Sequence, residues 1–122
     1  MKSEPGFSGD GTCYPDFVRN LPEVDVPVEG VRGWLLEDGT CQMVLFDIQP
    51  TAVVPEHKHC AQWGIMLEGE MDLTIAGVTR RVTTGDRYFI PANTMHSATF
   101  RTRVNVIDVF DAGDRYKKKR PG

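Results

Sequence analysis

The sequence predicts an all-β protein, a sandwich or barrel of short strands with little helix. From Val24 onward, short runs rich in β-branched and aromatic residues alternate with turn signals roughly every eight to ten residues, a spacing typical of sandwiches and barrels. No segment of about ten residues or more has a convincing 3.6-residue periodicity, and several prolines, including Pro50, Pro55 and Pro91, interrupt the candidates. Helix is therefore expected to be scarce.

Turn residues divide this region into short expected strands. Asp38-Gly39 is a hairpin signal, because glycine readily supplies the positive φ that tight primed turns need. Ala76-Gly77 and Thr84-Gly85-Asp86 mark further reversals. The strands are expected near residues 31–37, 41–49, 52–54, 62–68, 70–76, 78–83, 87–90, 96–101 and 103–110.

Length, charge and hydropathy limit the number of domains and the kinds of partner. The 122 residues suit a single domain, and the net charge of −3 gives no global attraction to nucleic acid or to an anionic membrane. No apolar run approaches the roughly 20 residues that cross a bilayer, and the N-terminus lacks the apolar core of a signal peptide. We expect a soluble, cytoplasmic protein with neither nucleic acid nor membrane as a partner.

The chain is expected to divide into an arm, a barrel and a tail. Residues 1–23 form an N-terminal arm that is a candidate to pack on a partner subunit, because the first 20 carry Gly, Ser, Pro and Asp with little periodicity. Residues 24–112 form the β-barrel. Residues 113–122 form a basic, solvated C-terminal tail.

The three histidines carry the strongest functional signal. His57 and His59 are separated by one residue, Gln62 follows three residues later, and His96 is the third histidine. Residues i and i+2 of a strand leave the same face about 6.5 Å apart, so both imidazoles could lean toward one point, and a later strand could bring His96 to it. Imidazole is the commonest ligand for borderline divalent metals, so the sequence predicts a mononuclear metal site.

The motifs resemble those of a known superfamily. The pattern His57-x-His59-x-x-Gln62-x6-Gly69, followed by Gly85-x5-Pro91-x-Asn93-x-x-His96, is similar to the paired motifs of the cupins and covers roughly residues 42–110. The resemblance implies a single jelly-roll β-barrel with a central pocket. It also implies a metal held by the three histidines, with Gln62 as a fourth candidate ligand and two or three open positions, and a homodimeric assembly.

Two positions depart from the family pattern. Gln62 stands where cupins normally place a metal-binding glutamate, and Asn93 stands where they place a glycine. Asparagine tolerates the left-handed conformation better than other non-glycine residues. A neutral Gln62 either coordinates through its carboxamide oxygen, leaving the full charge on the ion, or hydrogen-bonds a bound water or substrate; the sequence leaves both open.

Four further residues are candidates for the pocket. Trp63 and Tyr88 are candidates to contact substrate. Asp47 and Asp108 lie within apolar strands, where a carboxylate is costly unless it is paired or exposed. Each is either a general base in the pocket or a partner of an arginine on a neighbouring strand, Arg101 or Arg103.

The leading hypothesis is a metal-dependent enzyme for a small, oxygenated, metal-chelating ligand. One divalent ion is expected, and iron, manganese, zinc, nickel and cobalt all suit a histidine-rich site. The resemblance favours a dioxygenase, or an isomerase, cyclase or lyase, without choosing among them. The alternatives are a non-catalytic barrel that binds or senses a small molecule or sugar, and a structural barrel without metal.

Overall fold

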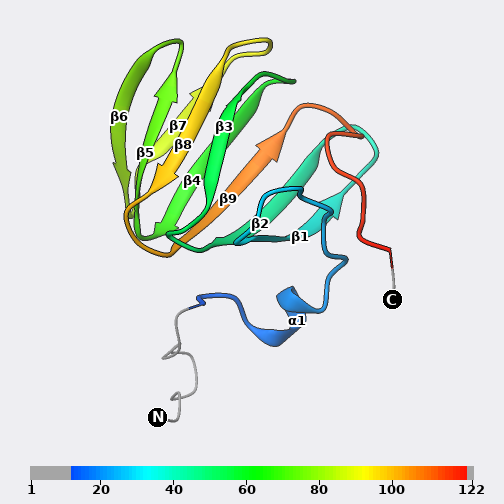
Figure 1. Cartoon of the computed structure of the whole chain (residues 1–122). Coiled ribbons are helices and arrows are strands. Elements are labelled where there is room, and N and C mark those ends of the chain that lie inside the picture. Colours follow the sequence, from blue (N-terminus) through cyan, green and yellow to red (C-terminus); the bar gives the residue numbers. More distant parts are fainter. Residues whose placement is uncertain (1–11, 121–122) are drawn as a thin grey trace, which may run out of the picture.

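Two antiparallel sheets face each other around a common interior (Figure 1). The computed structural model describes residues 12–120, and within them one short helix accompanies nine strands, as expected of an all-β protein. The elements are α1 (Asp16–Arg19), β1 (Val31–Glu37), β2 (Gln42–Ile48), β3 (Val53–His57), β4 (Gln62–Glu68), β5 (Glu70–Ile75), β6 (Val78–Thr83), β7 (Arg87–Ile90), β8 (His96–Phe100) and β9 (Val104–Phe110).

The strand order brings distant parts of the sequence side by side. One sheet has the order β1-β2-β9-β4-β7 and the other β3-β8-β5-β6. The strands lie close to their expected positions, and β3 differs most because it continues through Pro55 to His57. A proline is tolerated there because β3 is an edge strand, where a missing N–H breaks no ladder.

The main core fills the space between the sheets. Strand alternation points Val44 and Phe46 of β2 inward to meet Met71 and Leu73 of β5, and all four are buried in one hydrophobic cluster. Burial of such side chains contributes about 1.5–3 kcal/mol each. The polar residues described below therefore lie within a wall that packing holds in place.

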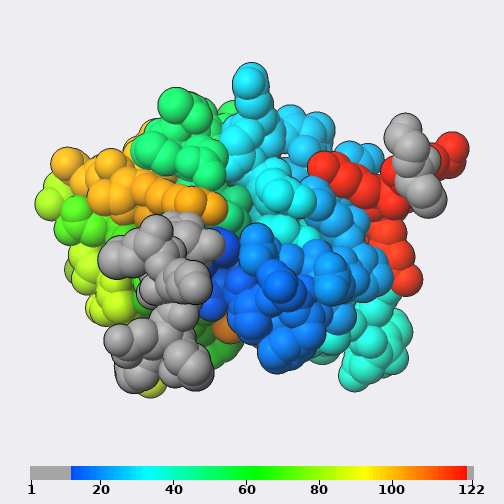
Figure 2. Space-filling view, turned by 90° about the horizontal axis from the view of Figure 1, so that it is seen from below, coloured from blue at the N-terminus to red at the C-terminus, as the bar shows by residue number. Residues whose placement is uncertain are grey.

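The N-terminal segment packs on the outer face of the five-stranded sheet of its own chain. Tyr14 is buried against Trp34 and Leu45, and its hydroxyl donates to the carbonyl oxygens of Phe46 at 2.9 Å and Val106 at 3.2 Å. In Figure 2 this segment, in dark blue, lies across the face seen from below. Packing of the arm on a partner stays a prediction, and residues 1–11 of the arm lie outside the described residues.

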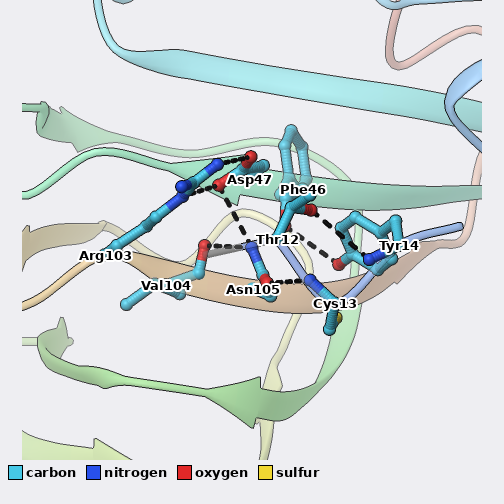
Figure 3. A network of polar contacts seen from close by, with 8 residues as sticks. All are labelled: Thr12, Cys13, Tyr14, Phe46, Asp47, Arg103, Val104 and Asn105. Carbon is cyan, nitrogen blue, oxygen red and sulfur yellow. Dashed lines mark hydrogen bonds and ion pairs between the residues drawn. The ribbon is translucent and has the colours of Figure 1, made fainter. Parts of the chain in front are cut away.

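A polar network joins the arm to the sheet (Figure 3). The backbone N–H of Cys13 donates to the Asn105 side-chain oxygen at 2.9 Å, and the Asn105 amide donates to Asp47 at 3.1 Å. Arg103 donates to both oxygens of the same carboxylate, at 2.8 and 2.6 Å. Asp47 therefore has the arginine partner that the sequence offered as one alternative.

The C-terminal segment is exposed over residues 117–120, as predicted for a basic tail, but its backbone is held against the barrel. The backbone N–H of Lys119 donates to the carbonyl of Glu23 at 2.7 Å, and that of Asp25 donates to the carbonyl of Lys117 at 2.8 Å. Gln42 accepts from the N–H of Tyr116 and donates to its carbonyl. The segment thus returns along the barrel.

Among the described residues, no helix has the length and apolar character that a membrane span requires.

Candidate metal centre

Two of the three histidines are neighbours in the four-stranded sheet. His57 ends β3, His96 begins β8, and the two are register partners. The register shifts between Val54 and His57, so β3 contains a β-bulge. Without this extra residue, alternation would point Val54 and His57 to opposite faces; with it, both line the same cavity.

His59 lies beyond β3, in a loop fixed to the loop that precedes β8. The backbone N–H of Asn93 donates to the carbonyl of His59 at 2.8 Å. Asn93 has a φ of 59°, the left-handed conformation for which asparagine is suited. This contact joins the two histidine motifs and holds His59 beside the strand pair.

The three imidazoles converge on one point. Their ligand nitrogens all lie within 4.8 Å of one another, with 3.1 Å between the Nε2 atoms of His59 and His96. Each Nδ1 lies 2.8 Å from a backbone carbonyl oxygen, those of Pro55, Cys60 and Thr94 in chain order. A carbonyl only accepts, so the proton belongs on each Nδ1, and each Nε2 presents a lone pair to the shared space.

This arrangement fits a divalent metal. Two nitrogens about 2.1 Å from an ion and at right angles around it are separated by about 3 Å, close to the 3.1 Å between His59 and His96. Burial lowers the pKa of His59 to about 4 and also lowers the pKa of His96. Neutral imidazole is the form that binds metal, so these two histidines are already in their binding state at neutral pH.

A carboxyl group and a phenol lie on the facing wall of the same cavity. Tyr88 in β7 donates a hydrogen bond of 2.5 Å to Asp108 in β9, although β4 runs between these strands. The β4 residue in that row is Gly64, whose register partners are Asp108 and Tyr88. A Cβ on Gly64 would collide with both side chains. The absence of a side chain at this position therefore permits the contact.

Asp108 is poised to exchange a proton. Burial raises its pKa to about 6, while hydrogen bonds from Tyr88 and Gln62 oppose that rise. Burial and the neighbouring carboxyl group raise the pKa of Tyr88 well above 10, so the phenol stays protonated. A carboxyl group whose pKa is close to neutral pH is suited to general acid–base catalysis.

Gln62 lines the same cavity from the first position of β4. Its side chain hydrogen-bonds to Tyr88 and to Asp108 and lowers the pKa of both groups. The amide is thereby associated with the carboxyl–phenol pair. Coordination of a metal by Gln62 stays a prediction.

Arg115 joins this site from a segment that the sequence assigned to the tail. Its guanidinium lies 4.3 Å from the ring centre of Tyr116 and 5.8 Å from that of Phe110, and all three residues line the cavity. Its Nε is buried and has no hydrogen-bond partner among the described residues. In the sequence, the feature that could have indicated a role for this segment in the cavity is Tyr116, an aromatic residue at the start of a charged run.

Two of the four predicted pocket residues lie elsewhere. Tyr88 and Asp108 line the cavity, whereas Trp63 and Asp47 do not. Trp63 follows an inward-facing residue in β4, and strand alternation points it to the outer face of the sheet. Asp47 lies in the network that holds the arm. The structure therefore gathers three histidines, Gln62, Tyr88 and Asp108 in one cavity and leaves the other two outside.

Comparison with known proteins identifies the family. The cupin domain matches residues 44–110, more than half of the chain. The chain belongs to the cupin superfamily. A solved RmlC-like cupin from Shewanella frigidimarina is similar in fold, with a TM-score of 0.71 and 23% identity over 94% of this chain and 97% of that one. KdgF from Halomonas sp. aligns with a TM-score of 0.65 and 25% identity, over 73% of this cupin and 84% of that chain.

A longer relative bears the name of an enzyme. This cupin is 31% identical over 93 residues to the H2HPP isomerase of Bacillus subtilis, an alignment that covers 71% of this chain. The chain spans only 39% of the length of that protein. Oxalate decarboxylase of Bacillus subtilis is similar in fold, with a TM-score of 0.68 and 21% identity over 80% of this cupin and 29% of that chain.

Proposed function

We propose that this cupin is a metal-dependent isomerase that moves a proton on a small carboxylic acid carrying a carbonyl group. The observation that carries the proposal is that Asp108 and Tyr88 face the three-histidine group across one cavity. A metal ligand set and a titratable carboxyl group are thus within reach of one small molecule. The isomerase name of the relative at 31% identity supports the same reaction class.

Each group of residues in the cavity has a separate role in the proposed reaction. His57, His59 and His96 would hold a divalent cation, which when bound supplies polarisation of the substrate carbonyl oxygen. Asp108 would then accept the proton from the carbon next to that carbonyl and leave an enolate. In a substrate with a C=C bond next to that carbon, the enolate is conjugated with it, so Asp108 can return the proton to the far carbon and the C=C bond moves by one position. Tyr88 donates its hydrogen bond to Asp108 throughout and fixes the direction of the carboxyl group.

Arg115 makes the cavity suitable for an anion. Its guanidinium is held against Tyr116 and Phe110, and its buried Nε has no partner among residues 12–120. A guanidinium binds a carboxylate through parallel hydrogen bonds. Imidazole ligands add no negative charge to the cation that they hold, which also favours an anionic substrate. The substrate class proposed here is therefore a small 2-oxo acid with a C=C bond next to C3, and a saturated 2-oxo acid would report the proton-abstraction step alone.

Proton exchange in heavy water tests the proposal. The metal-loaded protein is incubated with pyruvate or 2-oxobutyrate in D2O, and loss of the C3 proton signal is followed by NMR. Exchange faster than in buffer is expected, with a decrease of about 100-fold in Asp108→Asn and loss on chelation. The matched control is Asp47→Asn, a carboxylate equally buried but outside the cavity, which should keep the rate.

Other outcomes would replace the proposal. Dioxygen consumption with these acids, without proton exchange, would establish the dioxygenase alternative and would require a redox-active ion. Binding of the acids to the metal-loaded protein without exchange or dioxygen uptake would indicate a non-catalytic binding barrel. Unchanged exchange in Asp108→Asn would remove Asp108 from the mechanism.

A further inference from the structure

Residues 111–116 follow β9 and form neither helix nor strand, yet they carry an arginine that lines the cavity. We call this segment the strap. In Figure 1 it leaves the end of β9 and passes beside the β1–β2 hairpin. Its last two residues, Arg115 and Tyr116, belong to the cavity wall. A segment without a regular hydrogen-bond ladder is held by the contacts that other residues make with it, so those contacts decide where Arg115 lies.

The buried side chain of Gln42 holds the end of the strap. Gln42 is the first residue of β2 and is 1% exposed. Its amide nitrogen donates to the Tyr116 carbonyl oxygen at 3.0 Å, and its amide oxygen accepts from the Tyr116 N–H at 2.8 Å. The amide nitrogen also donates to a carboxylate oxygen of Glu37 at 3.2 Å. A flipped amide would turn its oxygen toward that carboxylate and its nitrogen toward the Tyr116 N–H, so one orientation satisfies all three contacts.

The position of Tyr116 in turn sets the position of the guanidinium. The Tyr116 ring packs against two core rings, with centroid distances of 5.9 Å to Phe46 and 5.3 Å to Phe110. The Arg115 guanidinium lies 4.3 Å from the centre of the Tyr116 ring. Phe110 also contacts the ring of His59, at 5.6 Å between centroids. Contacting rings thus connect the strap to the metal centre, and a displacement of Tyr116 would move the arginine relative to that centre.

The beginning of the strap is fixed by backbone contacts. The Asp111 N–H donates to the carbonyl of Ala61 at 3.0 Å. Gly113 lies so close to the β1–β2 hairpin that a Cβ on it would collide with the carbonyl oxygen of Gly39. Gly113 precedes Arg115 by two residues, so a side chain at position 113 would push away the part of the strap that leads to the guanidinium.

We infer that Gln42 is a positioning residue that gives the cavity its selectivity for anionic ligands. It does not line the cavity and acts through Tyr116 on Arg115. An arginine that is already in place loses less conformational entropy when it binds a carboxylate than an arginine on a loose segment. The affinity for a carboxylate therefore depends on a buried amide that no ligand touches. The inference rests on the carboxylate-binding role proposed for Arg115.

Calorimetric binding of two matched ligands to the metal-loaded protein tests the inference. 2-Oxobutyrate carries the carboxylate, and 2-oxobutyramide is a neutral analogue of similar shape. Gln42→Met keeps the length of the side chain and removes its hydrogen bonds. We expect the Kd for the acid to rise about 10-fold, with the Kd for the amide and the metal content unchanged. Gly113→Ala displaces the strap without altering Gln42 and should cause the same selective loss, which keeps the test open if Gln42→Met does not fold.

Asn105→Leu is the matched control. Asn105 is also 1% exposed and also makes three hydrogen bonds through its amide, but it holds the N-terminal segment through the N–H of Cys13. This variant removes a comparable buried amide from the neighbouring strand β9 and should bind both ligands as the wild type does. Equal weakening of acid and amide in Gln42→Met would overturn the inference, because general loosening of the cavity affects both ligands.

Arg115→Gln separates the inference from the proposed function. It should weaken binding of the acid at least as much as Gln42→Met does. Weaker binding in Arg115→Gln, with full affinity in folded Gln42→Met and Gly113→Ala, would overturn the inference and leave the proposed anion site intact. A wild type without affinity for the acid, or unchanged affinity in Arg115→Gln, would overturn both the anion site and the role of Gln42.

Discussion

Asp47 and Asp108 lie on neighbouring strands of one sheet, and the fold uses them in opposite ways. Both are nearly inaccessible, at 7% and 4% exposed. Asp47 in β2 accepts two hydrogen bonds from Arg103 and one from Asn105. Asp108 in β9 faces the cavity, where a neutral phenol is its closest partner. One carboxylate is neutralised, and the other is held without a counter-charge.

The difference shows how location decides the role of a buried acid. A buried charge that is paired and fully hydrogen-bonded fixes structure, and removing its partner is costly. A buried carboxyl group without a cation has a raised pKa and can exchange protons near neutral pH. Asp47 on the outer face of the sheet therefore contributes to the stability of the fold, while Asp108 on the inner face is available for the proposed chemistry.

The largest expected effect lies on the inner face. His57→Ala or His96→Ala should abolish stoichiometric metal binding, because two of three convergent nitrogens do not replace the full set. Elemental analysis of the purified proteins should show about one ion per chain in the wild type and almost none in either variant. The unfolding midpoint of the metal-free proteins should change little. Unchanged metal content in both variants would refute the site.

A substitution on the outer face should lower the free energy of unfolding and leave metal binding unchanged. Asp47→Ala leaves the Asn105 amide and the Arg103 guanidinium without their shared carboxylate, and should lower the free energy of unfolding by about 2 kcal/mol. Urea denaturation measures this loss. Asp72→Ala removes half-exposed ion pairs and should cost under about 1 kcal/mol. Reduced metal content in Asp47→Ala, with the fold intact, would contradict the separation of the two faces.

The free energy of unfolding should also depend on pH through Asp108. The pKa of Asp108 is raised to about 6 from an ordinary 3.8, so the folded state holds its proton more tightly than the unfolded state. The free energy of unfolding should therefore fall as pH rises from about 4 to 6, by at most about 3 kcal/mol. Asp108→Asn should lack this fall.

Urea titrations of the metal-free proteins at pH 4, 6 and 8 measure it. Contributions from the histidines are common to the wild type and to Asp108→Asn, so the difference between the two proteins isolates Asp108. Equal pH profiles for the two proteins would show that Asp108 titrates in the folded protein as it does in the unfolded chain.

The smallest effect concerns ion pairs in solvent. Lys119 lies 2.6 Å from Glu23, and Lys118 lies 3.6 Å from Glu37. Each lysine is more than half exposed, so Lys119→Ala or Lys118→Ala should cost about 0.5 kcal/mol, and less in high salt. A salt series of urea denaturation curves checks this. A loss as large as that of Asp47→Ala would mean that exposure does not govern the strength of these pairs.

Sequence patterns predicted the elements of this fold better than its tertiary contacts. Turn residues and β-branched runs placed the strands, and the spacing of His57, His59 and His96 predicted the cluster. The bulge in β3 could not be foreseen, because it depends on the pairing with β8. The contribution of Arg115 was hidden for a similar reason, since local composition does not show that a charged segment returns to the cavity.

The acidity of Asp108 depends on Gly64, a residue that has no ionisable group. It lies between Asp108 and Tyr88 in one row of three strands, and any larger residue would push the two apart. The phenol would then no longer stabilise the anion, and the carboxyl group would release its proton only at a higher pH. A single methyl group at position 64 could thus retune the acidity of the cavity while leaving every polar side chain of the site in the sequence.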